Sequence, residues 1–185
     1  MPFLFKPLAI PDVILIEPKV FPDNRGYFLE TFKSSDFSSN NLPNKFVQDN
    51  LSFSRKNVIR GMHFQKKPKE QGKLVSVIKG RVLDVAIDIR RESPTFMKWL
   101  AVELNDSQNT MLYIPEGFAH GFLSLTEEVY LLYKCTNEYD LQTDAGFRWD
   151  DPDIGISWPV NNPVISEKDQ RLPYFKHLDM SGKVN

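Results

Sequence analysis

The 185-residue sequence is poor in cysteine and histidine: it contains one cysteine, Cys135, and three histidines, His63, His120 and His177. One cysteine excludes an intrachain disulfide and a cysteine-based metal cluster, and it is typical of a protein in a reducing compartment. No two histidines form a His-x-His or His-x-x-x-His pair beside a carboxylate. The sequence therefore predicts no metal site.

Long hydrophobic runs and an excess of charge of one sign are missing as well. No stretch approaches the roughly 18 apolar residues of a membrane-spanning helix, and residues 1–20 lack the pattern of a signal peptide. Lys and Arg number 23 against 24 Asp and Glu, which gives a net charge of -1. Neither nucleic acid nor a membrane is therefore an expected partner, and we predict a cytoplasmic protein. A small anionic ligand stays allowed, because two or three cations suffice for a pyrophosphate.

The middle of the sequence consists of short segments rich in Val, Ile, Phe and Tyr, separated by Gly, Pro, Asn and Asp. This alternation of apolar runs and turn residues is typical of β-strands. Ten strands are predicted: Val13–Glu17, Tyr27–Phe32, Val47–Phe53, Val58–Phe64, Lys73–Lys79, Val82–Ile89, Lys98–Leu104, Thr110–Ile114, Gly121–Leu125 and Val129–Thr136. So many strands in one stretch predict an all-β sandwich or barrel, formed as a single domain over residues 1–185.

Two of these strands separate polar from apolar side chains by alternation. Residues 83–89 place Asp84 and Asp88 on one face and only apolar side chains on the other. Residues 47–54 carry amide and hydroxyl groups along one face: Gln48, Asn50, Ser52 and Ser54. This polar row has two interpretations, an ordinary solvent-facing surface or the lining of a barrel cavity.

Helix signals are few. Residues 34–41 are compatible with one or two helical turns, and Ser166-Glu167-Lys168-Asp169 is typical of a capped helix start. The proline-rich stretch from residue 152 to residue 173 carries apolar side chains for docking: Ile154, Ile156, Trp158, Val164 and Ile165. We therefore expect a C-terminal tail, from about residue 152, that packs on the barrel.

Two side chains have the chemistry for proton transfer. His63 can act as a general base near neutral pH, because an unperturbed histidine has a pKa of about 6.5. Alternation does not decide which carboxylate orients its ring, whether Asp84, Asp88 or Asp169. Tyr133 is either a core aromatic residue or a proton donor. Two cations are candidate ligands of an anion or oxyanion, or plain surface charges: Lys73 and Arg60.

Eight segments in order resemble the motifs of the dTDP-4-dehydrorhamnose 3,5-epimerase family, from near the start of the chain to about residue 170. They are Phe21-Pro22-Asp23-Asn24-Arg25-Gly26-Tyr27-Phe28-Leu29-Glu30, Phe46-Val47-Gln48-Asp49-Asn50, Arg60-Gly61-Met62-His63-Phe64-Gln65, Gln71-Gly72-Lys73-Leu74-Val75, Asp84-Val85-Ala86-Ile87-Asp88-Ile89-Arg90, Ile114-Pro115-Glu116-Gly117-Phe118-Ala119-His120-Gly121-Phe122, Tyr133-Lys134-Cys135-Thr136 and Ser166-Glu167-Lys168-Asp169. Each segment alone is a weak signal, whereas eight in order are specific.

The resemblance implies a cupin-type double-stranded β-helix, or jelly roll, with short peripheral helices. It also implies a homodimer that holds a sugar nucleotide inside the barrel and uses no metal or organic cofactor. Family members invert C3 and C5 of dTDP-4-dehydro-6-deoxy-D-glucose, which gives dTDP-4-dehydro-L-rhamnose. The hydrogens beside the C4 ketone are acidic because the carbanion delocalises onto oxygen as an enolate.

At the matching positions, the resemblance implies four catalytic roles: His63 as base, Asp169 as its orienting carboxylate, Lys73 as the cation near the enolate oxygen, and Tyr133 as the acid on the opposite ring face. It implies substrate-binding roles for a further set: Arg25, Glu30, Gln48, Asn50, Arg60, His120, Tyr139, Asp144 and Lys168. Gln48 and Asn50 then favour the cavity interpretation of the polar row. The clearest departure lies at residues 140–146, where Asp144 stands in place of the family's commoner glutamate.

Three rival functions fit parts of the sequence. A single-carbon 3- or 5-epimerase of a related 4-keto sugar nucleotide uses the same base and tyrosine, and residue types do not separate it. A non-catalytic sugar-nucleotide-binding cupin would lack a base or an acid, whereas His63, Asp169 and Tyr133 are all present. A metal-dependent cupin oxygenase or isomerase would need ligands that this sequence does not contain.

Overall fold

The computed structural model describes residues 2–178, which form thirteen strands and three short helices. The strands are β1 (Phe3–Pro7), β2 (Ile14–Pro18), β3 (Val20–Asp23), β4 (Gly26–Leu29), β5 (Gln48–Arg55), β6 (Ile59–Gln65), β7 (Lys73–Lys79), β8 (Arg81–Asp88), β9 (Trp99–Asn105), β10 (Met111–Ile114), β11 (Phe118–Ser124), β12 (Glu128–Cys135) and β13 (Asp144–Gly146). The helices are α1 (Ser34–Ser39), α2 (Glu167–Gln170) and the 3-10 turn η1 (Phe175–His177).

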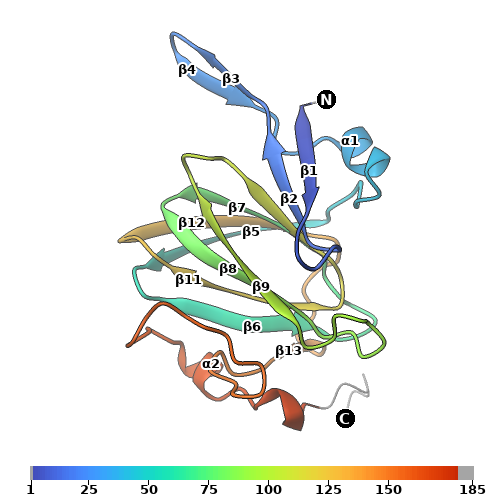
Figure 1. Cartoon of the computed structure of the whole chain (residues 1–185), viewed down its shortest axis with the longest axis vertical. Helices are drawn as coiled ribbons and strands as arrows, with labels where there is room; N and C mark the ends of the chain where they lie inside the picture. Colours follow the sequence, from blue (N-terminus) through green and yellow to red (C-terminus); the bar gives the residue numbers. More distant parts are fainter. Residues whose placement is uncertain (1, 179–185) are drawn as a thin grey trace.

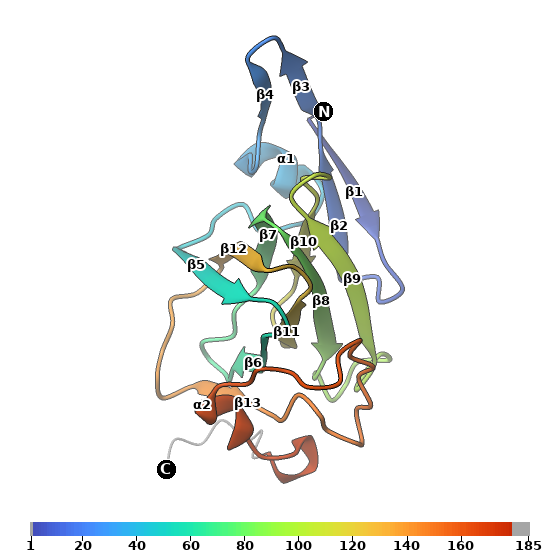
Figure 2. The same cartoon turned by 90° about the vertical axis from the view of Figure 1, so that its left-hand side faces the viewer.

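Two antiparallel sheets face each other and form the body of the molecule (Figures 1 and 2). The six-stranded sheet has the order β1-β2-β10-β7-β12-β5, and the five-stranded sheet has the order β13-β6-β11-β8-β9. Strands that are neighbours in a sheet come from distant parts of the chain, as in a jelly roll. The two remaining strands, β3 and β4, pair only with each other in a hairpin that projects from the body (Figure 1).

All ten predicted strands are present, with ends displaced by at most three residues, and three further strands were not predicted. β1 and β3 contain Pro7 and Pro22, which argue against a strand because proline cannot donate to the ladder. β13 has only three residues and no alternation. Two ends are displaced by three residues: β4 ends at Leu29 instead of Phe32, and β11 begins at Phe118 instead of Gly121, because a glycine inside a strand is easily taken for a boundary.

The apolar side chains form three clusters, one between the sheets and one on the outer face of each sheet. The barrel core lies between the sheets and includes Val75, Ala86 and Leu131. On the outer face of the five-stranded sheet, a tail core joins strand residues such as Phe64 and Ile87 to the chain after residue 152. The third cluster packs helix α1 against the six-stranded sheet.

The C-terminal tail passes over β6 and β13, at the lower end of the molecule in Figure 1. Of the side chains expected to dock, Ile154, Ile156 and Trp158 belong to the tail core. Val164 is 58% exposed and holds the tail through a backbone bridge to Val58 instead. The tail thereby covers the outer face of the strand that carries His63.

The burial of their side chains shows where the polar faces of β8 and β5 lie. Asp84 and Asp88 were expected on a polar face, but both are fully buried, because the inner face of β8 lies inside the barrel. On β5, Gln48, Asn50 and Ser52 are half-buried while Leu51 is 63% exposed. The polar row therefore lines the barrel, as the cavity interpretation required.

Candidate active site

A cavity of about 210 Å³ lies between the sheets, at the centre of the polar residues that the sequence singled out. Its lining comes from both sheets: Ser52, Arg60, His63, Lys73, His120, Gly121, Phe122 and Tyr133. His63 projects from the five-stranded sheet, whereas Lys73 and Tyr133 project from the six-stranded sheet. Three of the four predicted catalytic residues therefore line one cavity.

The fourth, Asp169, contacts His63 from the C-terminal tail, 106 residues away in the chain. His63 Nε2 lies 2.7 Å from Asp169 Oδ1, and the Gly61 N–H donates to Oδ2 at 3.3 Å. Burial raises the pKa of Asp169, but the hydrogen bonds and charge of His63 and the Gly61 N–H outweigh it, so the pKa lies below its ordinary value. Because the ionised carboxylate only accepts hydrogen bonds, Nε2 donates and Nδ1 is left to take up a proton.

The short helix α2 presents Asp169 to His63. Ser166 caps its N-terminus by accepting a hydrogen bond from the Asp169 N–H at 3.1 Å, as the sequence predicted. The cap fixes the backbone of Asp169 itself, and the Asp169 side chain is then buried against β6. The His63–Asp169 pair thus depends on the four-residue helix α2, whose start is fixed by the Ser166 cap.

Lys73 is a buried cation. Only 9% of its surface is exposed, and burial lowers its pKa, opposed in part by the nearby Cys135, Asp84 and Asp144. Its ammonium group lies 5.9 Å from the centre of the Tyr133 ring. A cation in so dry a position interacts strongly with any negative charge that forms in the cavity.

Tyr133 faces the cavity from the sheet opposite His63. Burial raises the pKa of its phenol, with Cys135 adding to the rise and Arg60 opposing it. The hydroxyl is therefore protonated at neutral pH and can donate. Cys135, two residues further along β12, is fully buried and accepts a hydrogen bond from Asn50 at 3.6 Å.

A second histidine–carboxylate pair borders the same cavity. His120 Nε2 lies 2.9 and 3.0 Å from the two oxygens of Asp84, and both residues are buried. His120 and His63 are cross-strand partners on β11 and β6, so both rings leave the sheet on the same side. Asp84, which the sequence left undecided, therefore orients His120, and Asp169 orients His63.

Two glycines allow β6 and β11 to approach each other beside these histidines. A Cβ on Gly61 would lie 2.6 Å from the Cα of Gly121, and a Cβ on Gly121 would lie 2.6 Å from the sulfur of Met62. Gly61 also has a φ of +133°, which disfavours any other residue. The contact shifts the register of the two strands after His120 and sets the spacing of the two rings.

The predicted binding residues Gln48, Asn50, Tyr139, Asp144 and Lys168 are linked by hydrogen bonds. Gln48 donates to Asn50 at 2.9 Å and accepts from the Tyr139 N–H at 2.7 Å. Asp144 accepts from the Tyr139 hydroxyl at 3.3 Å and pairs with Lys168, whose pKa this contact raises. These residues form one connected group, in which Asp144 already has two partners.

Arg60 and Ser52 complete the cavity wall. Arg60 donates to the Ser54 hydroxyl at 3.0 Å and to the Phe53 carbonyl at 2.9 Å, which holds its guanidinium against β5. The Ser52 hydroxyl is buried and has no hydrogen-bond partner in the described part of the chain. The sequence placed Ser52 in the polar row without a role; its unsatisfied hydroxyl on the cavity wall is free to hydrogen-bond to a bound molecule.

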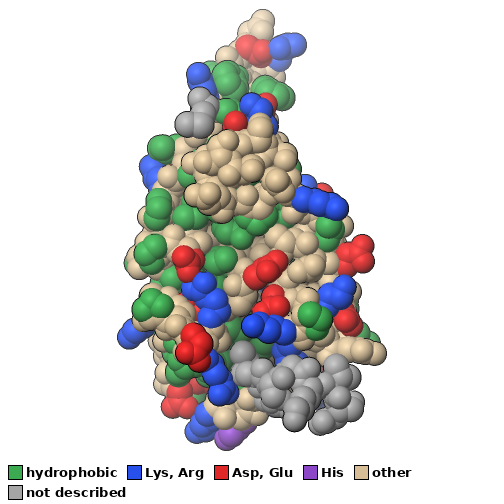
Figure 3. Space-filling view, turned by 90° about the vertical axis from the view of Figure 1, so that its right-hand side faces the viewer, with side chains coloured by type: hydrophobic (Ala, Val, Ile, Leu, Met, Phe, Trp, Pro, Cys, Tyr) green, Lys and Arg blue, Asp and Glu red, His purple; other side chains and the backbone are tan. Residues whose placement is uncertain are grey.

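Arg25 and Glu30 lie apart from this cavity. Arg25 sits at the turn of the β3–β4 hairpin, where its exposed guanidinium pairs with Asp23 at 2.6 Å. The hairpin points away from the barrel, with charged side chains at its tip and hydrophobic ones along it (Figure 3). A single chain thus does not bring these two residues to His63.

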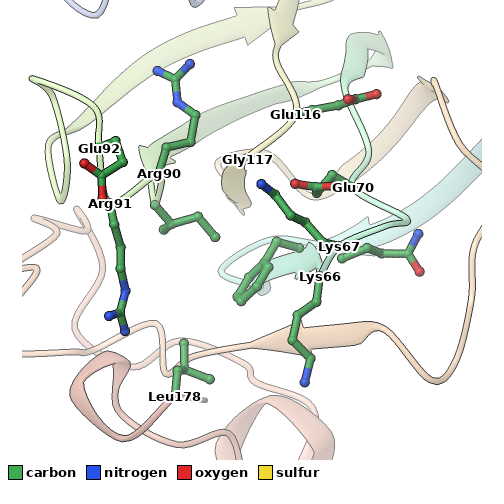
Figure 4. Close-up of a pocket in the computed structure, with 12 residues that line it drawn as sticks. Lys66, Lys67, Glu70, Arg90, Arg91, Glu92, Glu116, Gly117 and Leu178 are labelled. Carbon is green, nitrogen blue, oxygen red and sulfur yellow. The ribbon is translucent and has the colours of Figure 1, made fainter. Parts of the chain in front are cut away.

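A larger cavity, of about 650 Å³, lies outside the barrel beside Leu178. None of the residues of either histidine–carboxylate pair lines it. The side chains of Arg90, Arg91 and Lys66 point in different directions and do not converge on a common point (Figure 4). The smaller cavity between the sheets is therefore the candidate active site.

The fold and the cavity define a class of protein: a cupin with a histidine–aspartate pair and a tyrosine on opposite walls of its cavity. Among the residues that the structure describes, no group of three His, Cys, Asp or Glu could hold a metal ion. The chain belongs to the dTDP-4-dehydrorhamnose 3,5-epimerase family, whose family model matches residues 7–177.

Individual relatives agree with this assignment. A dTDP-4-dehydrorhamnose 3,5-epimerase from Methanothermobacter thermautotrophicus is 50% identical over 171 residues, which cover 91% of this chain and 92% of the relative. A crystal structure of a Legionella pneumophila dTDP-6-deoxy-D-glucose-3,5-epimerase with dTDP-4-keto-L-rhamnose has a TM-score of 0.93 at 39% identity, covering 97% and 96% of the two chains. A 3'-monoepimerase from Streptomyces bikiniensis in complex with dTDP-quinovose matches with a TM-score of 0.85 at 33% identity, covering 91% and 86%.

Proposed function

We propose that this protein inverts C3 and C5 of dTDP-4-dehydro-6-deoxy-D-glucose to give dTDP-4-dehydro-L-rhamnose. The observation that carries the proposal is the His63–Asp169 pair at 2.7 Å, facing Tyr133 across a cavity that also holds the buried Lys73. Membership of the family and the likeness to a 3,5-epimerase with its product-like ligand support the same substrate class.

The first step is removal of a proton next to the C4 ketone. His63 takes the proton from carbon, and the imidazolium that forms is stabilised by the Asp169 carboxylate. The electron pair of the broken C–H bond moves onto the C4 oxygen and forms an enolate. Lys73 stabilises this negative charge, and its burial increases the effect because little water screens it.

The second step returns a proton to the opposite face of the sugar ring. Tyr133 donates its phenolic proton to the same carbon, the enolate collapses to the ketone, and the configuration is inverted. His63 and Tyr133 come from opposite sheets, so a ring lying between the sheets presents one face to each. Proton exchange with solvent then resets both groups before the second carbon reacts.

Substrate binding falls to the remaining polar residues. Arg60, His120 and Ser52 line the cavity and would contact the sugar and its neighbouring phosphate. The connected group of Gln48, Asn50, Tyr139, Asp144 and Lys168 would hold the nucleotide, with Lys168 near the pyrophosphate and Tyr139 stacked on the base.

We further propose that the protein works as a homodimer. Helix α1 covers one part of the outer face of the six-stranded sheet, and an apolar strip stays open beside it, where Leu51, Phe53 and Ile78 are 63%, 42% and 56% exposed. An open strip of this kind marks an interface. A second copy would cover the strip, and the projecting hairpin would then bring Arg25 and Glu30 to the neighbouring cavity.

The cytoplasm is the proposed location, since the one cysteine is a free buried thiol. Within residues 2–178, no helix is long and apolar enough to cross a membrane.

The experiment that tests the function is incubation with dTDP-4-dehydro-6-deoxy-D-glucose in deuterium oxide, followed by NMR. Deuterium at both C3 and C5, with formation of the L-rhamno product, is the expected result. Deuterium at C3 alone would assign the second candidate, a single-carbon epimerase, which the likeness to a 3'-monoepimerase favours. No deuterium at either carbon would exclude both.

A further inference from the structure

The proposed base His63 and its carboxylate Asp169 lie 106 residues apart in the chain, and one stretch of chain pairs with His63 and contacts Gln170, the neighbour of Asp169. This stretch runs from Gly146, the last residue of β13, to Asp150. Gly146 is the cross-strand partner of His63, and the next residue, Phe147, exchanges two backbone hydrogen bonds of 3.1 Å with Met62. The stretch is therefore fixed to the residue that directly precedes the base.

Glycine at position 146 lets the stretch come this close. A Cβ there would lie 2.4 Å from the Met62 carbonyl oxygen, 3.0 Å from the Leu172 side chain and 3.3 Å from the Cδ2 atom of His63. Leu172 follows helix α2 by two residues. Position 146 is thus a point where the base strand and the tail that bears Asp169 meet.

Arg148 continues the connection toward the carboxylate. Its Nη1 atom donates to the carbonyl of Gln170 at 2.8 Å, and its backbone N–H donates to the carbonyl of Pro173 at 3.0 Å. Gln170 directly follows Asp169 and ends helix α2, where carbonyl groups lack partners within the helix. Arg148 therefore holds the end of the helix that presents Asp169.

The guanidinium of Arg148 is itself held in place. Asp150 accepts from Nε at 2.8 Å and from Nη2 at 2.7 Å, a two-point contact that fixes the plane of the group. The face of the guanidinium lies 5.4 Å from the centre of the Tyr174 ring. With Nε and Nη2 committed to Asp150, Nη1 is directed at Gln170, and a lysine could not reproduce this geometry.

We propose that Arg148, locked by Asp150, is a positioning residue for the His63–Asp169 dyad. Phe147 ties it to the neighbour of the base, and its own side chain ties it to the neighbour of the carboxylate. Arg148 does not line the cavity, and it acts by setting the position of Asp169 relative to His63. The proposal rests on the proposed function for its kinetic test but not for its spectroscopic one.

The kinetic test compares Arg148→Lys with the wild-type protein in the deuterium assay. Loss of the two-point contact lets helix α2 shift, so kcat should fall by about 10- to 100-fold, while KM stays within about twofold. Arg171→Lys is the matched control: Arg171 lies directly after α2 and pairs only with the exposed Glu167 at 3.2 Å. This control should retain the wild-type kcat.

The spectroscopic test uses the protein without substrate. The His63 ring N–H that donates to Asp169 should give a downfield NMR signal protected from exchange, identified by its loss in His63→Ala. Arg148→Lys should broaden or remove that signal, and Arg171→Lys should keep it. If Arg148→Lys fails to fold, Asp150→Asn replaces it in both tests. That variant weakens the contact that holds the Arg148 guanidinium but keeps the charge of Arg148.

Two results would overturn the proposal. One is a variant whose melting temperature falls while the His63 signal and the kcat per folded molecule stay at wild-type values, because the contact would then only stabilise the tail. The other is an Arg148→Lys variant with the wild-type melting temperature, kcat and His63 signal. If the wild-type protein gave the His63 signal but no turnover, the proposed function would fail, and the effect of Arg148→Lys on the signal would still decide the positioning role.

Discussion

The two histidine–carboxylate pairs of the cavity share their chemistry but differ in how the chain supports them. Asp84 reaches His120 from the adjacent strand β8, within one sheet, and both are buried. Asp169 reaches His63 from the C-terminal tail, and the His63 side chain is 33% exposed. The difference indicates two roles: the enclosed pair, His120 and Asp84, holds a donor in place, while the open pair, His63 and Asp169, leaves Nδ1 of His63 able to exchange protons with solvent.

The largest effect is expected from breaking the open pair at its histidine. His63→Ala removes the proposed base, and kcat should fall by about 10³-fold, in the range that general-base catalysis supplies. The deuterium assay measures this directly, as loss of label at both carbons. Turnover near the wild-type rate would remove His63 from the mechanism, whatever its contact with Asp169.

A somewhat smaller effect is expected when only the carboxylate of the open pair changes. Asp169→Asn keeps the shape of the side chain but loses the charge that stabilises the imidazolium, so kcat should fall by about 10²-fold. KM should change little, because Asp169 is buried behind His63. A rise in KM with an unchanged kcat would instead assign Asp169 to substrate binding.

A change in the enclosed pair should affect stability more than activity. Asp84→Asn weakens a charged hydrogen bond in the core, which should lower the free energy of unfolding by about 1.5–3 kcal/mol. The loss of kcat should be milder, about tenfold, because the base is intact. Urea denaturation together with the deuterium assay checks both. If Asp84→Asn lost more kcat than Asp169→Asn, the roles assigned to the two pairs would be reversed.

The smallest expected effect is the pH dependence of the open pair's contribution to stability. The pKa of Asp169 lies below its ordinary value of 3.8 in the folded protein. Its ionised form therefore stabilises the fold above that value, and the contribution is lost as the pH falls through the lower folded pKa. The melting-temperature gap between wild type and Asp169→Asn should shrink below about pH 4, in a series of thermal melts from pH 7 downward. A gap that widens in acid would contradict the shift.

Much of the fold and of this site could be predicted from sequence, because both depend on local patterns. Period-two alternation located ten strands, and the cap motif at Ser166 located the helix that bears Asp169. Alternation could not tell the inside of a barrel from its surface, so it placed Asp84 on the polar face of β8 without showing that this face is fully buried.

Contacts between distant segments were out of reach of local patterns. Residues alone left Asp84, Asp88 and Asp169 as equal partners for His63, and only the resemblance selected Asp169, which the fold then placed at 2.7 Å. Arg148 carried no signal at all, because a salt bridge to a residue two positions away is typical of any surface. The contact that matters is the hydrogen bond from Arg148 to the carbonyl of Gln170, 22 residues further along the chain.

The late position of Asp169 in the chain has a consequence for synthesis on the ribosome. The strands that carry Asp84, His63 and His120 are complete by residue 124, whereas Asp169 is added 45 residues later. A nascent chain thus contains the strands of the His120–Asp84 pair before it contains Asp169, the partner of His63. The His63–Asp169 contact can form only after Asp169 has been added and the tail packs on β6.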